Sequence, residues 1–162
     1  MEVAVHRLHD LPADALAPLV AEGERGGWRF VRRLADEWAA GTNRFDRAGE
    51  GLFAAVAGGV VVGVCGLNAD PYAADPTIGR IRRLYVLRVY RRHGVGRRLA
   101  EEAVHAARGR FRSLRVRTES AGAGRLYERL GFVPAVGVPA CTHALRLAPD
   151  AEPDSVLSTG LS

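Results

Sequence analysis

The sequence predicts an α/β fold in which a twisted, mixed β-sheet is flanked by helices. β-type runs come first, partly as a hairpin series, and later runs alternate with segments of helical periodicity. Two glycines spaced one residue apart stand where one of these runs meets a helical segment. The length of 162 residues suits one domain with its own core, which we place at residues 1–148.

The first forty residues are expected to form one strand and two helices. Residues 3–8 alternate in side-chain character, as a half-buried strand does. An amphipathic stripe over residues 11–20 predicts a helix, with Asp10 as its cap and Pro12 in its first turn. Two glycines at 26–27 interrupt the pattern. Apolar residues then recur at spacings of three and four over residues 28–40, which predicts the second helix.

The middle of the chain is expected to contribute three strands. Gly41 ends the second helix, and a polar loop follows it. Residues 52–57 and 60–67 are β-type runs joined by Gly58 and Gly59, which is the signature of a two-residue hairpin. After a second loop, the apolar run over residues 78–89 predicts the fourth strand.

The C-terminal part is expected to alternate between helices and strands. Helical periodicity covers residues 95–108 and 120–130, the second stretch ending at a glycine. Strands are predicted at residues 112–118 and 140–147. Residues 149–162 contain too little apolar material to pack, so we expect a disordered tail there.

The strand-to-helix turn at residues 91–99 has the character of a phosphate cradle. Because Gly94 and Gly96 lack a Cβ, backbone N–H groups can converge there on an anion. The following helix adds its unpaired first-turn donors and the positive end of its dipole. Arginines raise the positive charge further, so we expect anion binding by Arg91, Arg92, His93, Gly94, Val95, Gly96 and Arg97. The alternative is a turn that only lets the helix pack close to the strand.

A second motif downstream gives the cradle a context. Arg-x-x-Gly-x-Gly is followed by Ala-x-x-x-Tyr-x-x-x-Gly-Phe, which starts at Ala123 and contains Tyr127. The pair resembles the GNAT superfamily of acyl-CoA-dependent N-acyltransferases, over residues 60–147. The resemblance implies a sheet splayed after the fourth strand, with the pantetheine arm of the cofactor in the V-shaped opening. It also implies acetyl-CoA as co-substrate.

The resemblance assigns roles to further residues. The backbone amides of residues 92–97 would hold the pyrophosphate. A β-bulge at Leu84, Tyr85 and Val86 would turn backbone groups toward the pantetheine and the thioester. Ser120 stands where relatives often have a cofactor-binding asparagine, and its shorter side chain can also cap the helix. Arg88 stands where proline is common, which affects only how the strand ends.

The resemblance also implies that Tyr127 is the general acid that protonates the departing thiolate. A phenol is a proton donor at neutral pH and its pKa of about 10 is reasonably matched to a thiol. The structural alternative is a buried tyrosine packed on Gly131 and Phe132, with its hydroxyl bonded to the backbone. The general base is left unassigned, because Arg80 stands where many relatives carry glutamate. Three carboxylates could reach the site or be solvated loop charges: Asp70, Asp75 and Glu119.

Composition excludes several function classes. The net charge is +5, yet all 23 basic residues are arginine, which looks like biased composition, and aromatic residues are only 7%. We therefore expect no nucleic acid as partner. No apolar run is long enough for a membrane span and no signal peptide is evident, so we expect a cytoplasmic protein without membrane contact. Two distant cysteines and five scattered histidines predict free thiols and no metal site.

The leading prediction is an enzyme that moves an acetyl group from acetyl-CoA to a primary amine, by direct attack. A small-molecule acceptor is favoured, because aromatic residues could close a pocket over it, although they could also be core residues. The expected acceptor residues are Trp28, Phe30, Arg33, Asn68 and Tyr72. The alternatives are acetylation of a protein N-terminus or lysine, and a non-catalytic acyl-CoA-binding domain. The sequence leaves open a homodimer and the use of other acyl groups.

Overall fold

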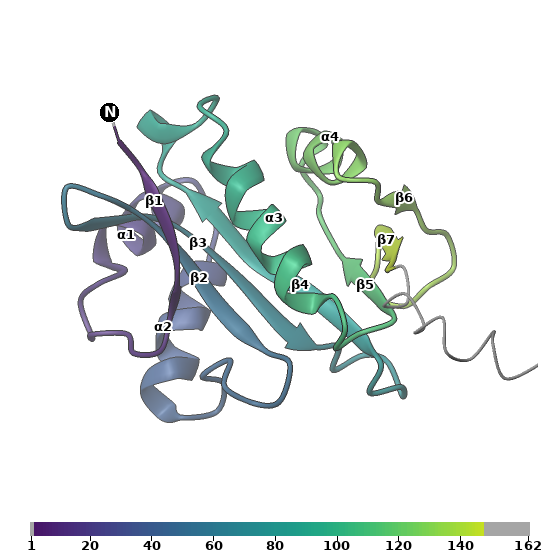
Figure 1. The fold of residues 1–162 in the computed structure, drawn as a ribbon. Coiled ribbons are helices and arrows are strands. Elements are labelled where there is room, and N and C mark those ends of the chain that lie inside the picture. The colour runs from purple at the N-terminus through teal and green to yellow at the C-terminus, as the bar shows by residue number, and fades with distance from the viewer. Residues whose placement is uncertain (1, 148–162) are drawn as a thin grey trace, which may run out of the picture.

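Seven strands form a single mixed sheet in the computed structural model, which describes residues 2–147 (Figure 1). The tail predicted at residues 149–162 lies outside the described residues. In chain order the elements are β1 (Ala4–Leu8), α1 (Ala17–Arg25), α2 (Phe30–Ala40), β2 (Gly51–Ala57), β3 (Val60–Ala69), β4 (Ile78–Val86), the 3₁₀ turn η1 (Arg88–Tyr90), α3 (Val95–Ala107), β5 (Ser113–Val116), α4 (Ala121–Arg129), β6 (Val133–Pro134) and β7 (His143–Arg146). The predicted α/β class is confirmed.

The strand order is β1-β2-β3-β4-β5-β7-β6, and β4 and β5 form the one parallel pair among the described strands. Their pairing covers only Ile78 to Arg80 against Ser113 to Arg115. β4 continues to Val86, whereas β5 diverges from it, as Figure 1 shows. The predicted splay after the fourth strand is therefore present.

Helices cover both faces of the sheet and create two cores. α3 crosses the face toward the viewer in Figure 1, and the core beneath it includes Leu99, Ile81 and Leu114. α1 and α2 lie behind the sheet, where Leu16, Leu34 and Val64 are buried with their neighbours. Each core residue named has at most 2% of its surface exposed, so burial of both sheet faces supplies the main stabilising term.

Three glycines take the conformations that the sequence predicts. Gly58 and Gly59 have φ values of 56° and 79°, the double positive φ of a type I′ hairpin turn. Gly41 has a φ of 76° and ends α2 in the left-handed conformation.

The first helix begins later than predicted. α1 starts at Ala17 rather than near residue 11, so the expected cap at Asp10 and first-turn position of Pro12 are wrong. The reason is Pro18, which lies at the start of α1. A helix from residue 11 would place this proline in its interior, where the ring clashes with the carbonyl four residues earlier.

Strand ends also differ from the prediction. β4 ends at Val86, because the Arg88 N–H donates to the Glu22 carboxylate and the chain turns into η1. The last strand begins at His143 rather than at Ala140, whose φ of 53° does not fit a strand. The two-residue β6 was not predicted, because a strand that short has no periodicity to detect.

Candidate active site

The cradle forms at the N-terminus of α3, next to the end of β4. Gly94 is the N-cap residue with a φ of 76°, and no side chain caps the helix. Arg92 also has a positive φ, of 65°. The first-turn N–H groups therefore have no side-chain acceptor and face outward with the positive end of the helix dipole. This geometry suits the binding of an anion such as a pyrophosphate.

The two glycines serve the cradle in different ways. A Cβ on Gly94 would meet nothing within 4 Å, so glycine is required there by the backbone conformation. A Cβ on Gly96 would lie 3.4 Å from Leu126 Cδ1 and 3.7 Å from Val86 Cγ2. Gly96 thus stands where α3, β4 and α4 converge, and its missing side chain keeps that meeting point open.

The basic side chains around the cradle are not equally available. Arg91 donates from Nε to the Val86 carbonyl at 2.9 Å and stacks over the Tyr85 ring at 5.3 Å. Arg97 pairs with Glu101 at 2.7 Å. Val95 is buried, so it offers only its N–H. Arg92 and His93 are exposed, and neither side chain has a partner among the described residues, so both can meet a ligand.

A β-bulge lies in β4 at the start of the segment where the resemblance implies one. Val64 is opposite Tyr85 and Gly66 is opposite Arg82, so Cys65 faces both Arg83 and Leu84. Arg83 takes a φ of 62°, which reorients the backbone there. Because β5 pairs with β4 only as far as Arg80, the bulge lies beside the opening between the two strands.

Tyr127, on α4, belongs to the same buried core as Cys65, the β3 residue that faces this bulge. Its side chain is buried, and its ring packs edge-on against Phe132 with centroids 5.3 Å apart. Burial raises the pKa of the phenol well above 10, and the nearby Cys65 thiol adds to the effect. No hydrogen bond joins the hydroxyl to any residue within the described range 2–147. The structural alternative is thus met in part, since the ring is buried and packs on Phe132, whereas the bond from the hydroxyl to the backbone is not found among these residues.

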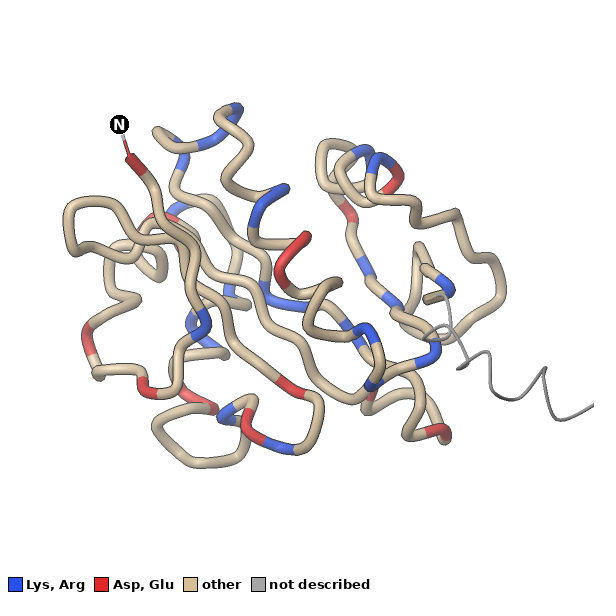
Figure 2. The backbone as a smooth tube through the Cα atoms, viewed as in Figure 1, with Lys and Arg blue, Asp and Glu red and all other residues tan. Residues whose placement is uncertain are grey.

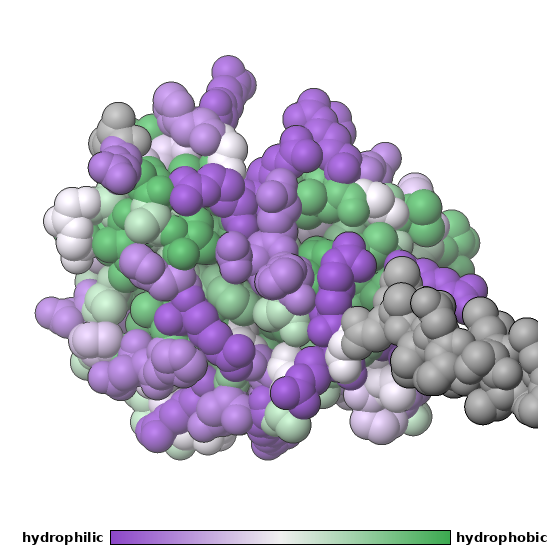
Figure 3. Space-filling model, viewed as in Figure 1, coloured by the Kyte–Doolittle hydropathy of each residue, from purple (hydrophilic) through white to green (hydrophobic). Residues whose placement is uncertain are grey.

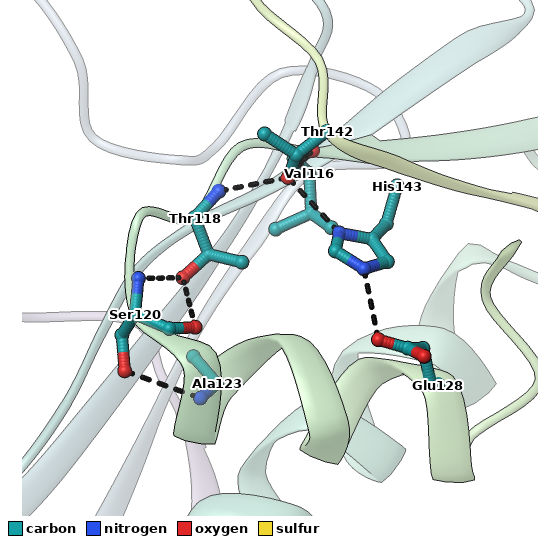
Figure 4. A network of polar contacts seen from close by, with 7 residues as sticks. All are labelled: Val116, Thr118, Ser120, Ala123, Glu128, Thr142 and His143. Carbon is teal, nitrogen blue, oxygen red and sulfur yellow. Dashed lines mark hydrogen bonds and ion pairs between the residues drawn. The ribbon is translucent and has the colours of Figure 1, made fainter. Parts of the chain in front are cut away.

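Ser120 acts first as a helix cap. Its Oγ accepts the Ala123 N–H at 3.3 Å, and its own N–H donates to Thr118 Oγ1 at 3.2 Å. Figure 4 shows how these contacts continue to Thr142, the residue before β7, whose Oγ1 accepts the Thr118 N–H at 3.0 Å. The same network reaches α4 through His143, whose Nε2 lies 3.2 Å from Glu128 Oε2. The network fixes α4, and with it Tyr127, against β5 and β7.

The expected acceptor residues lie on the α1/α2 side of the sheet, in separate groups. Trp28 and Phe30 form an edge-to-face series with Tyr85, at centroid distances of 6.1 and 5.8 Å. Trp28 is 46% exposed. Asn68 is buried, exchanges side-chain hydrogen bonds with Asn43 and pairs opposite Arg80 in the sheet.

The other two expected acceptor residues lie near arginines of β4. Tyr72 places its ring 4.8 Å beneath the guanidinium carbon of Arg80. Arg33 is exposed on α2, and its charge acts on Arg83. The structure therefore brings Asn68 and Tyr72 together around Arg80, with Trp28 and Phe30 at the other end of β4.

Glu22 is a site-forming residue that the sequence did not reveal. Its carboxylate accepts the Tyr85 hydroxyl at 2.7 Å and the Arg88 N–H at 2.9 Å. Burial opposes its ionisation, but these two hydrogen bonds and the charge of Arg91 outweigh burial and lower the pKa of Glu22. The same contact, together with burial, raises the pKa of Tyr85 to about 12. Since the partners are distant in sequence, no local pattern could have indicated this contact.

Each of the three nearby carboxylates has an arginine or a hydrogen-bond donor beside it. Asp70 is buried with its oxygens 3.7 Å from Arg80 and 3.9 Å from Arg115. Asp75 accepts hydrogen bonds from Thr77, which lower its pKa. Glu119 is exposed beside Arg117. Within residues 2–147 there is also no group of three side chains that could hold a metal ion.

Comparisons with known proteins agree with this geometry. The family model described as "Acetyltransferase (GNAT) family" matches residues 15–132. A proposed acetyltransferase from Exiguobacterium sp. 255-15 is 26% identical, with a TM-score of 0.79 and full coverage of both chains. A proposed GNAT-family acetyltransferase from Desulfovibrio desulfuricans is 24% identical, with a TM-score of 0.69, and covers 91% of this chain and 100% of its own.

A third solved structure was determined with a ligand. It is the GNAT-family N-acetyltransferase YhbS from Escherichia coli in complex with CoA, with 17% identity and a TM-score of 0.62, covering 90% of this chain and 82% of its own. Comparison with curated proteins gives no sequence match. No helix in the described part of the chain has the length and apolar character needed to cross a membrane.

Proposed function

Because the chain belongs to the GNAT acetyltransferase family, we propose that it transfers the acetyl group of acetyl-CoA to a primary amine of a small molecule. The Tyr127 hydroxyl is the observation that carries this proposal. It is a proton donor on a buried ring, it has no protein partner in the described residues, and its core also holds Cys65, which faces the β4 bulge. Because no protein group holds this hydroxyl, its proton is available to a group bound beside it.

The residues present fit acetyl-CoA as co-substrate. The α3 N-terminus offers N–H donors to the pyrophosphate, and Arg92 and His93 add polar groups beside it. β4 leads from the cradle to the bulge. The edge of β4 that faces β5 is unpaired beyond Arg80. Figure 3 shows the surface notched between the loop that precedes α3 and α4. An extended pantetheine arm fits this course.

When bound, the thioester supplies an activated acetyl carbon. In the reaction, the amine nitrogen forms a bond to that carbon and the carbon–sulfur bond breaks. Tyr127 donates its proton to the departing sulfur and regains a proton from the amine through solvent. Backbone N–H groups of the bulge at Arg83 and Leu84 would stabilise charge that develops on the carbonyl oxygen.

Thiol release from acetyl-CoA in the presence of a panel of primary amines tests the proposal. We expect release that depends on the amine and an acetylated product of matching mass. A lysine-containing peptide and a peptide with a free N-terminus are included to test protein acetylation. Cofactor binding without thiol release from any amine or peptide would favour a non-catalytic acyl-CoA-binding domain instead.

A further inference from the structure

Four arginines gather on the α1/α2 side of the sheet where β4 and β5 part. Arg80, Arg82 and Arg83 belong to β4, and Arg115 belongs to β5, in register with Arg80. We call these four residues the arginine cluster. Figure 2 shows basic positions along both strands on either side of the opening.

Nearby acids neutralise this cluster only in part. Glu37 pairs with Arg83 at 2.7 Å. Asp70 lies between Arg80 and Arg115, at 3.7 and 3.9 Å, distances too long for hydrogen bonds. Four guanidinium groups therefore share two carboxylates. Burial is the main cause that lowers the pKa of Arg83, and the positive charges of Arg82 and Arg33 add to it.

Several polar atoms in the cluster and beside it are buried without a hydrogen-bond partner. They are Arg80 Nη1, Arg82 Nε, Arg83 Nε and, between the arginines, Asp70 Oδ2. The Arg80 side chain is only 8% exposed. An unsatisfied buried guanidinium atom costs free energy, so these atoms offer donors that a bound anionic group or ordered water can satisfy.

The distance between the cluster and the cradle indicates whether a group bound at the cluster belongs to the cofactor or to the acceptor. The cradle lies at the far end of β4, about 20 Å from Arg80 for six residues at 3.3 Å each. The bulge at Arg83 and Leu84 lies between the cradle and the other two β4 members of the cluster, Arg80 and Arg82. The cluster thus lies past the expected thioester position, on the face that also carries Asn68 and Tyr72. A group bound there belongs to the acceptor rather than to the cofactor phosphates.

We propose that the acceptor is a small amine that also carries an oxyanion, a carboxylate or a phosphate, which the arginine cluster binds. The inference rests on the proposed acetyl transfer and specifies its acceptor. Arginine binds both oxyanions with its fork of N–H donors, so the two share one chemistry. The same positive charges disfavour an ammonium group nearby, which increases the neutral fraction of the acceptor amine. They thereby compensate for the missing carboxylate base.

Matched acceptor pairs test this inference. α-Amino acids are compared with their primary amides, and phosphoethanolamine with ethanolamine, by kcat/KM for thiol release. We expect the charged member to be preferred at least tenfold in the first pair, the second or both, which also distinguishes carboxylate from phosphate. The amine of an amino acid amide is less basic than that of the acid, so a larger fraction of it is neutral at the assay pH. A preference for the acid therefore cannot come from a larger neutral fraction.

Variants connect the preference to the cluster. Arg82→Gln and Arg115→Gln should reduce it to less than threefold, and Arg82→Lys should restore part of it. Arg108→Gln, an exposed arginine at the end of α3, is the control and should leave it unchanged. Equal rates for charged and neutral members in the parent enzyme would overturn the inference, as would a preference that survives both cluster substitutions.

A binding measurement separates this inference from the proposed function. Calorimetry on the CoA-loaded protein compares N-acetyl amino acids with their amides, and O-phospho-N-acetylethanolamine with N-acetylethanolamine. If no amine releases thiol but the oxyanion ligands bind and Arg82→Gln abolishes binding, acetyl transfer is refuted and the oxyanion site remains. If thiol is released but neutral ligands bind equally well, only the oxyanion site is refuted.

Discussion

Tyr127 is the residue on which catalysis should depend most. Tyr127→Phe removes the hydroxyl and retains the ring packing against Phe132, so the fold and the acetyl-CoA Kd should change little. We expect kcat to fall by about 10²-fold, the low end for general acid catalysis, because a thiolate is already a fair leaving group. Steady-state kinetics with chemistry shown to be rate-limiting measures this.

The pH dependence gives a second check on Tyr127. Because burial raises its pKa well above 10, the phenol stays protonated and the rate should not decline on its account below pH 10.

A fall in kcat of less than threefold in Tyr127→Phe would mean that water protonates the thiolate.

Trp28 is predicted to contact the acceptor. It is 46% exposed and touches Phe30 at an edge, so Trp28→Ala should cost little stability. We expect the acceptor KM to rise several-fold and the acetyl-CoA KM to stay the same. Val136→Ala, which is 95% exposed, serves as the control. Loss of thermal stability with both KM values unchanged would assign Trp28 to packing.

Single residues differ in how far the sequence reveals them. Tyr127 and Gly94 stand in spaced motifs, so their positions could be predicted. The left-handed conformation of Arg83 could not, because arginine has no preference for it and the bulge arises from the register of β4 on β3. The unsatisfied atoms around Arg80 were equally hidden, since they depend on three strands and loops meeting in space.

At the level of elements, the α3 N-terminus should control cofactor affinity. Gly94→Val strains a φ of 76°, and Gly96→Val places a branched side chain beside Leu126 and Val86. Each should weaken acetyl-CoA binding at least tenfold, about 1.4 kcal/mol. Calorimetry on folded protein measures the affinity.

Gly59→Val is a matched control for backbone strain. Gly59 has a φ of 79° and open space around its Cβ position, as Gly94 has, but lies in the β2–β3 hairpin. This variant should lose stability and keep its acetyl-CoA affinity. Unchanged affinity in both cradle variants would show that the turn does not hold the cofactor.

Helices and strands with strong periodicity were predictable, and their ends were less so. The 3.6-residue pattern located α2 and α3 within two residues. α1 was misplaced because its stripe extends over residues that form turns, and Pro18 determines the true start. An amphipathic stripe shows only which side chains are buried. Turns with buried side chains can give the same stripe as a helix.

For the whole molecule, stability should fall in alkaline solution. Burial raises the pKa of Cys65 to about 12 and that of Tyr127 well above 10, and Tyr85 is raised to about 12 by burial and Glu22. In the unfolded chain these groups ionise near pH 8.5 and 10. Their contribution is therefore complete below those values and is lost as pH rises toward 12. Each group should add a slope of about −1.4 kcal/mol per pH unit to the free energy of unfolding.

Cys65→Ala isolates the first part of this loss. The variant will be less stable at every pH because of the cavity. Between pH 9 and 10, however, its free energy of unfolding should stay nearly constant while that of the parent declines. Urea unfolding at a series of pH values gives both curves, and parallel curves would contradict the assignment to the buried thiol.

The pairing of β4 with β5 over only three residues should make local opening of the fold easier at this place. The unit of β5, β7, β6 and α4 shares only that short ladder with the rest of the sheet, although apolar side chains still join the two parts. Such a unit should exchange its amide hydrogens through partial opening, at a lower free energy than global unfolding. A pantetheine arm bound along β4 would supply amide groups where a neighbouring strand is missing. Acetyl-CoA should therefore slow hydrogen exchange in β5 and β7 much more than in β2 and β3, whose ladder is complete without it.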